Sequence, residues 1–172
     1  MKRDQGDVHM ERKDEALTAT VSYSIFALAR SHRALAAQLL REINLFAGQE
    51  IMLMYLWNND GQSQQSLGRS IGLDHSTVAK SMKRLEEAGL VTRTRSNQDG
   101  RVTLVYLTET GRNLEAKVND IWKELEQITT RGLTSSECDI IVSLAHRITA
   151  SIDAADAPFG VSSVPPIIKE DI

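Results

Sequence analysis

The feature that most constrains the fold is residues 62–111, where the local signals change in a fixed order. The stretch supplies a short helix, a glycine turn, a second amphipathic helix and a hairpin with a basic tip. We expect the first helix to begin at Ser63, whose hydroxyl can accept from the free N–H groups of the first turn, and to end at Ile71. Gly72 tolerates the positive φ that the corner needs, and Gly68 lets the second helix cross closely.

The second helix is predicted to start after Asp74 as its N-cap. Val78, Met82 and Leu85 recur at steps of four and three residues, so they lie on one face directed at the core. The opposite face carries hydroxyls and cations, the side chains that reach base edges and phosphates in a DNA major groove. The candidate DNA contacts on this helix are His75, Ser76, Thr77, Lys80, Lys83 and Arg84. The alternative is an ordinary solvated helix face.

A hairpin is predicted from two apolar or alternating runs, residues 91–94 and 102–107, with turn-forming residues between them. An arginine at the tip of such a hairpin can enter a minor groove, whose negative potential attracts it. We expect Asp99 to hold the side chain of Arg101 in one rotamer, and a local surface ion pair is the alternative. The candidate DNA contacts on this wing are Arg93, Arg95, Asp99 and Arg101. The order of elements is that of a winged helix-turn-helix.

Residues 45–114 resemble the MarR family of bacterial transcription regulators. The resemblance rests on residues 73–91, LDHSTVAKSMKRLEEAGLV, followed by a D-x-R-x-x-x-V-x-L-T-x-x-G pattern. The residues that match this second pattern are Asp99, Arg101, Val105, Leu107, Thr108 and Gly111. The chain departs from the family pattern at Phe46, where a helix-capping hydroxyl is common, at Gly68, where alanine is usual, and at Ser81, where an aliphatic residue is usual.

The resemblance implies a homodimer that binds double-stranded DNA at a pseudo-palindromic operator. Helix residues would enter adjacent major grooves and wing arginines the flanking minor grooves. Carried over by position, Ser76, Thr77 and Lys80 match the base-reading region, and Asp99 and Arg101 match the wing pair.

The distribution of charge agrees with a DNA-binding winged part. The whole chain has a net charge of −3. Residues 62–107 contain seven Lys or Arg against four Asp or Glu, a local +3, which leaves −6 on the rest. We expect the acidic remainder to repel phosphate and so confine DNA to the winged face.

The helices outside the winged part are read from their apolar spacing. Residues 21–43 form a predicted long helix with His32 inside its apolar seam, and residues 48–58 form a helix that is apolar nearly all the way round. The second of these helices is expected to lie between the long first helix and the winged lobe, where the resemblance implies a ligand crevice. His32, Met52, Tyr55 and Trp57 are the candidate lining of this pocket for a small aromatic or phenolic effector. Plain core packing is the favoured alternative for these residues.

Two more amphipathic helices follow the wing. Thr108 caps the first, which is expected to run to Gly132, and Thr134 with Glu137 has the spacing of a capping box at the start of the second. With the long N-terminal helix they carry more apolar surface than the winged lobe can cover, which favours a homodimer over an intramolecular bundle.

The predicted fold class is mainly α with a small β-hairpin wing (α+β), a winged helix-turn-helix lobe joined to a helical dimerisation lobe. Its parts are a mobile arm at 1–16, a dimerisation helix at 17–46, the winged lobe at 47–111, dimerisation helices at 112–152 and an extended or disordered tail at 153–172.

The sequence shows no catalytic or cofactor motif, so we expect neither an enzyme nor a resident cofactor or metal. One cysteine, Cys138, excludes an internal disulfide, and we expect a packed thiol there rather than a redox sensor. The longest apolar run, residues 51–57, is too short to span a membrane, and Asp4 and Asp7 stand where a signal peptide needs an apolar core. We therefore expect a cytoplasmic protein.

The predicted function is a sequence-specific transcription regulator, as a repressor, modulated by a small effector. The alternatives are a winged-helix protein-interaction module without a ligand response and a redox- or metal-responsive regulator.

Overall fold

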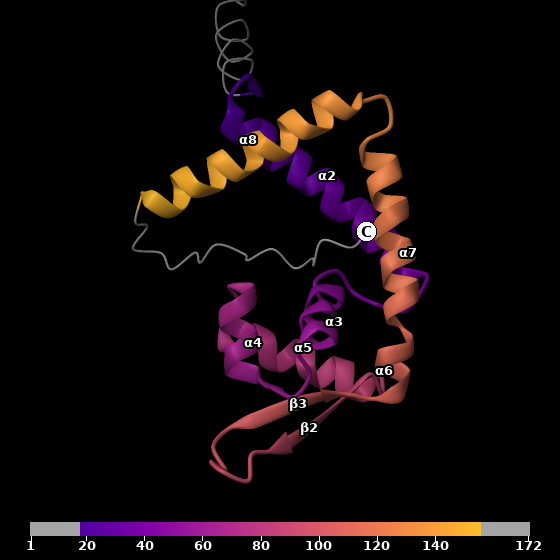
Figure 1. Ribbon diagram of the computed structural model, residues 1–172, viewed down its shortest axis with the longest axis vertical. Coiled ribbons are helices and arrows are strands. Elements are labelled where there is room, and N and C mark those ends of the chain that lie inside the picture. Colours follow the sequence, from indigo (N-terminus) through magenta and orange to yellow (C-terminus); the bar gives the residue numbers. More distant parts are fainter. Residues whose placement is uncertain (1–17, 156–172) are drawn as a thin grey trace, which may run out of the picture.

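Residues 18–155 are described by a computed structural model, in which a winged lobe lies below two long helices and a third long helix runs down along its side (Figure 1). The long helices are α2 (Val21–Arg41), α7 (Glu115–Thr129) and α8 (Ser135–Ala154). The winged lobe comprises α3 (Gln49–Asn58), β1 (Gln62–Ser63), α4 (Gln64–Ile71), α5 (His75–Glu87), β2 (Val91–Arg95), β3 (Thr103–Leu107) and α6 (Glu109–Asn113). The predicted arm at 1–16 lies outside the described residues, as does the predicted tail beyond residue 155. The first two tail positions, 153 and 154, belong to α8.

The helix-turn-helix forms as the sequence predicts. The Ser63 hydroxyl accepts from the backbone N–H of Ser66 at 3.0 Å and so caps α4. Gly72 ends α4 with φ 72°, the left-handed conformation that glycine adopts without strain. A Cβ on Gly68 would lie 3.1 Å from Cγ2 of Val78. Glycine therefore lets α4 and α5 approach closely.

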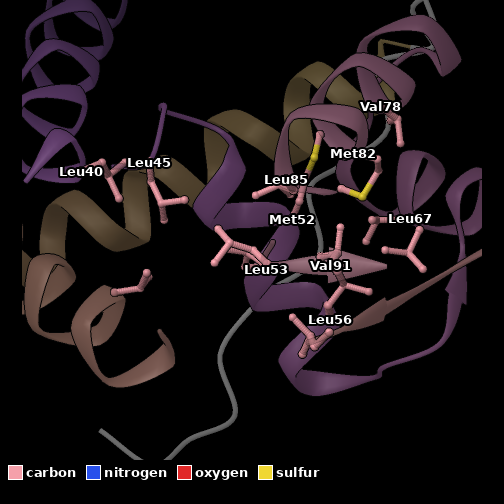
Figure 2. Packing of buried hydrophobic residues seen from close by; sticks show 14 of the residues in the cluster. Leu40, Leu45, Met52, Leu53, Leu56, Leu67, Val78, Met82, Leu85 and Val91 are labelled. Atoms are coloured by element: carbon pink, nitrogen blue, oxygen red, sulfur yellow. The ribbon is translucent and has the colours of Figure 1, made fainter. Parts of the chain in front are cut away.

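One apolar core holds the winged lobe together and extends to the end of α2 and to α7. Val78, Met82 and Leu85 of α5 are buried, as their spacing predicts. Figure 2 shows them converging with residues of α3 and with Leu67 of α4. Leu40 and Leu45 join the same cluster from the end of α2 and the turn after it. α2 and α5 therefore pack against one common core.

The wing belongs to a three-stranded antiparallel sheet with the strand order β1-β3-β2. β2 pairs with β3 in a register that places Val91 opposite Leu107 and Arg95 opposite Thr103. The two-residue strand β1 was not predicted. Its Ser63 pairs with Leu104 and also caps α4. The added strand attaches the root of the wing to the start of α4.

The turn between α2 and α3 replaces the hydroxyl cap that Phe46 lacks. The predicted long helix ends at Arg41 rather than at residue 43, and Asn44 turns the chain with φ 59°. The side chain of Gln49 accepts from the backbone N–H of Phe46 at 2.9 Å, and the carboxylate of Glu50 accepts from that of Gly48 at 2.6 Å. Burial raises the pKa of Glu50. The buried side chains of Gln49 and Glu50, both in the first turn of α3, therefore accept from the N–H groups that precede the helix.

The chain after the wing is helical with a short interruption. The Thr108 hydroxyl caps α6 by accepting from the N–H of Gly111 at 3.0 Å, as predicted. The expected single helix divides at Leu114 into α6 and α7, and α7 ends at Thr129, before Gly132. Leu114 keeps right-handed helical dihedrals, φ −80° and ψ −17°, so the two segments are nearly continuous. The capping box of Thr134 and Glu137 forms at the start of α8.

Candidate nucleic-acid interface

The polar face of α5 is open to solvent. Burial of Val78, Met82 and Leu85 directs the opposite face outward, so all six predicted contacts on this helix are exposed. They are His75, Ser76, Thr77, Lys80, Lys83 and Arg84. The hydroxyls lie in the first turn, and the two lysines lie one and two turns further along. The helix can therefore present short polar groups and long cations to one ligand.

Asp74 accepts hydrogen bonds from two side-chain hydroxyls as well as from the backbone of α5. Its Oδ1 accepts from the backbone N–H groups of Ser76 and Thr77 at 2.9 and 3.0 Å, which is the expected capping contact. The same carboxylate also accepts from both hydroxyls, at 2.6 Å from Ser76 Oγ and 2.6 Å from Thr77 Oγ1. These hydrogen bonds, that from the Ser76 hydroxyl first, hold the pKa of Asp74 far below its ordinary value.

The three cations of the face differ in what holds them. Lys80 is exposed. Lys83 lies 3.6 Å from the carboxylate of Glu87, and both side chains are largely exposed, so this contact stabilises little. The guanidinium carbon of Arg84 lies 5.9 Å from the ring centroid of Phe46, within the range of a cation–π contact. Phe46 thus contacts α5 from the turn between α2 and α3.

Arg101 is presented at the tip of the wing by its backbone. The carboxylate of Asp99 accepts from the backbone N–H of Arg101 at 2.9 Å, and Arg95 donates to the Arg101 carbonyl at 3.3 Å. Among the described residues, no ion pair or hydrogen bond holds the Arg101 guanidinium. The expectation that Asp99 restrains the Arg101 side chain is therefore wrong, because the carboxylate is used in closing the turn of the loop. The guanidinium stays available for a ligand.

Arg93 differs from the other wing arginines. It donates from Nε and Nη2 to Oε2 of Glu86, at 2.9 and 2.6 Å, and its backbone N–H donates to Oε1 at 3.1 Å. Its side chain is 26% exposed. These bonds hold the pKa of Glu86 below its ordinary value. The structure thus places Arg93 against α5 rather than at the wing tip, and Glu86 is a residue that the sequence analysis missed.

Three of the four predicted pocket residues pack in or against the core, and none of the four lines the cavity described below. Met52 is 1% exposed inside the core. The Tyr55 hydroxyl donates to the carbonyl of Ser70 at 3.1 Å, and the Trp57 indole donates to that of Gly111 at 3.0 Å. Both rings therefore tie α3 to neighbouring elements, which agrees with the core-packing alternative. His32 is half-buried on α2.

A shallow cavity of about 610 Å³, open to solvent, lies along α2 instead. It is lined by Phe26, Ala29, Arg30, Arg33, Ala34, Ala37 and Ala47. Phenylalanine and alanines supply an apolar wall, and two arginines supply positive charge. The alanine spacing was visible in the sequence, but its place beside the turn after α2 was not.

Metal ligands, the cysteine and membrane-spanning helices are the other features that bear on the predictions for residues 18–155. No group of three or more His, Cys, Asp or Glu side chains that could hold a metal occurs there. Cys138 is a half-buried free thiol on α8. No described helix is both long and apolar enough to cross a membrane.

Comparison with protein families and with known sequences finds similarity to transcriptional regulators. The family model "Transcriptional regulator SarA/Rot" matches residues 34–118. The organic hydroperoxide resistance transcriptional regulator of Bacillus subtilis is 36% identical over 99 residues, which cover 56% of this chain and 67% of the relative. The HTH-type transcriptional regulator TtmR of Methylorubrum extorquens is 27% identical over 151 residues, covering 88% and 75%.

Solved structures share the fold. A MarR transcriptional regulator from Methanosarcina mazei matches with TM-score 0.69 and 27% identity, covering 78% of this chain and 97% of the other. MepR of Staphylococcus aureus, solved with DNA, matches with TM-score 0.70 and 25% identity, covering 77% and 98%. PcaV of Streptomyces coelicolor, solved with its natural ligand, matches with TM-score 0.69 and 27% identity, covering 82% and 95%.

Proposed function

Because this chain belongs to the MarR family of winged helix-turn-helix transcription regulators, we propose that it is a repressor that binds a pseudo-palindromic DNA operator as a homodimer. A small effector alters this binding. Relatives and structural neighbours are transcriptional regulators, and some bind ligands.

The observation that carries the DNA-binding proposal is the outward polar face of α5 beside an arginine-tipped wing. Lys80 and Lys83 are exposed on α5, and Arg101 is exposed at the wing tip with its guanidinium held by no described residue. Cations of this kind neutralise phosphates, and a helix face with hydroxyls fits a major groove. The alternative of a protein-interaction module needs no such concentration of cations.

The proposal of a homodimer rests on apolar surface that the monomer leaves uncovered. None of the α8 residues is buried, although Ile140, Ile141, Val142 and Leu144 are among them. On α2, Val21 is 67% exposed and Leu28 is 61% exposed. Exposed apolar side chains gathered on two helices favour a protein contact, and a second copy of the same helices would cover them isologously. Two-fold pairing would also place two α5 helices on successive half-sites.

The proposal of an effector rests on the cavity along α2. Its volume of about 610 Å³ lies within the usual range of small-molecule sites. Phe26 and the alanines would contact an apolar ring, and Arg30 and Arg33 would pair with an anionic or phenolic group. Ala47 extends the cavity lining to the turn after α2. The residue before it in this turn, Phe46, contacts Arg84 of α5. Ligand binding would shift the population between arrangements of the two α5 helices.

The test is a DNA selection followed by salt titration. Duplexes enriched from a random library should show two related half-sites about one helical turn apart. Lys80→Ala and Lys83→Ala should each flatten the dependence of log K on log salt by about one unit if each lysine neutralises one phosphate. Lys123→Ala removes an exposed lysine of α7 and should leave the slope unchanged. A monomeric protein with no salt-dependent duplex binding would support the protein-interaction alternative.

A further inference from the structure

The hydroxyls of Ser76 and Thr77 both donate to the carboxylate of Asp74, and this fixes what they can offer to DNA. We infer that this turn of α5 reads the exocyclic amino group of adenine or cytosine, because Asp74 leaves the two hydroxyls as hydrogen-bond acceptors only. The inference rests on the proposed function and goes further by naming the chemical group that is read. The DNA-facing role of this turn is part of that proposed function, and it is supported by the exposure of both side chains on α5.

The direction of these hydrogen bonds follows from the charge of the carboxylate. An ionised carboxylate only accepts, so each hydroxyl hydrogen must lie on the line toward Asp74. The two oxygen–oxygen distances are both 2.6 Å, the length of charge-assisted O–H···O⁻ bonds. The lowered pKa of Asp74 keeps the group ionised at neutral pH. Reversing either hydroxyl toward DNA would break one of these short bonds.

A hydroxyl has one hydrogen and two lone pairs, so these two side chains face outward as acceptors. Ser76 and Thr77 are both exposed on the polar face of α5. In the major groove, the donors are the N6 amine of adenine and the N4 amine of cytosine, while guanine and thymine present acceptors there. Contact with guanine O6 or thymine O4 would bring two acceptors together beside a carboxylate. That arrangement is repulsive.

The expected specificity is for the DNA strand that carries the amine, not for one base pair over another. Every base pair carries one such amine, on adenine in A·T and on cytosine in G·C. An acceptor-only hydroxyl therefore distinguishes which strand carries the amine at the base pair it touches. Lys80, one turn further along the same face, has only donors, so it favours guanine, thymine O4 or a phosphate. We expect each half-site to place adenine or cytosine on the strand that faces the first turn of α5.

The experiment uses the full chain and base analogues that lack single groups. In the enriched duplex, each adenine of a half-site is replaced by purine, which lacks the N6 amine, and each cytosine by 2-pyrimidinone, which lacks the N4 amine. The matched analogues are 7-deazaadenine and 7-deazaguanine, which lack the N7 acceptor at the same base pairs. Binding is measured for the wild type, Ser76→Ala and Thr77→Val, with circular dichroism as the check of folding.

Loss of one amine should weaken wild-type binding by about two- to tenfold, the effect of one hydrogen bond. The same loss should have clearly less effect in Ser76→Ala or Thr77→Val, and the 7-deaza analogue at that base pair should leave wild-type binding unchanged. Equal penalties in all three proteins, or loss caused by the 7-deaza analogue instead, would overturn the inference while leaving DNA binding intact. Enrichment of no duplex would overturn the proposed function and the inference together.

Discussion

Glu86 of α5 and Arg93 of β2 form a contact of three hydrogen bonds that joins α5 to the wing. The side chain of Arg93 donates twice to one carboxylate oxygen, at 2.9 and 2.6 Å, and its backbone N–H donates to the other at 3.1 Å. A helix and a wing that meet the same duplex must keep a fixed angle between them. This contact joins the last turn of α5 to the third residue of β2, where it restrains that angle.

The first prediction is that the two residues act as one unit. Glu86→Gln and Arg93→Gln should each weaken operator binding by roughly threefold to tenfold, and the double variant should be no weaker than the single ones. If Arg93 contacts phosphate directly, Arg93→Gln alone should flatten the salt dependence of binding, and the two effects should add. Titrations of the four proteins at several salt concentrations separate these outcomes.

The second prediction concerns the wing tip. Arg101→Ala should weaken operator binding and lower the slope of log K against log salt by about one unit. No described residue pairs with the Arg101 guanidinium, so this group is free to neutralise a phosphate or to enter a minor groove. Arg131→Ala, an exposed arginine between α7 and α8, is the matched control. Unchanged affinity of Arg101→Ala with an intact dimer would remove the wing contact from the proposal.

Regular spacing made most of the fold predictable. Ser63, Gly72 and Asp74 act locally, so their capping and turn roles were read from the sequence and are confirmed. The apolar stripe of α5 is likewise confirmed, because burial follows the helical repeat. Strand β1 was missed because two residues carry no periodicity.

Tertiary contacts explain what the sequence did not predict at the site. Arg93 has the same residue type and hairpin context as Arg95, and only the crossing of α5 over β2 brings it to Glu86. Asp99 was expected to pair with a side chain, but a short loop needs its carboxylate for a backbone N–H. Opposite charges on either side of the turn between α5 and β2 were the available signal for the Glu86–Arg93 contact.

The third prediction tests whether Phe46 positions Arg84. Phe46→Leu keeps an apolar side chain but removes the ring, and it should weaken operator binding by about two- to fivefold, the effect of an exposed cation–π contact. Phe46→Tyr keeps the ring and should bind as the wild type does. In an Arg84→Gln background, Phe46→Leu should have no further effect. A loss that persists in that background would assign Phe46 to the stability of the turn instead.

The fourth prediction concerns α8. Ile141→Glu places a charge on apolar surface that is 48% exposed in the single chain. If a second copy covers this surface, the variant should dissociate to monomer, because an unpaired buried charge strongly opposes association. Ser143→Glu adds the same charge to an exposed polar position of α8 and serves as the control. Analytical ultracentrifugation measures both, and an unchanged mass of the Ile141 variant would place the interface elsewhere.

The fifth prediction follows from the lowered pKa of Asp74. A carboxyl whose pKa is lower in the folded state stabilises that state fully above the unfolded pKa of about 3.9, and this stabilisation is lost as pH falls through the folded value. Asp74→Asn keeps a capping oxygen but removes the charge, so wild type should unfold at a higher temperature than the variant at neutral pH. The difference should narrow below about pH 4, since the unfolded chain then binds a proton that the folded chain still excludes. The other acidic groups are present in both proteins and largely cancel in this comparison. A difference that is constant from pH 7 to pH 2 would mean that Asp74 is not held as a carboxylate by the two hydroxyls.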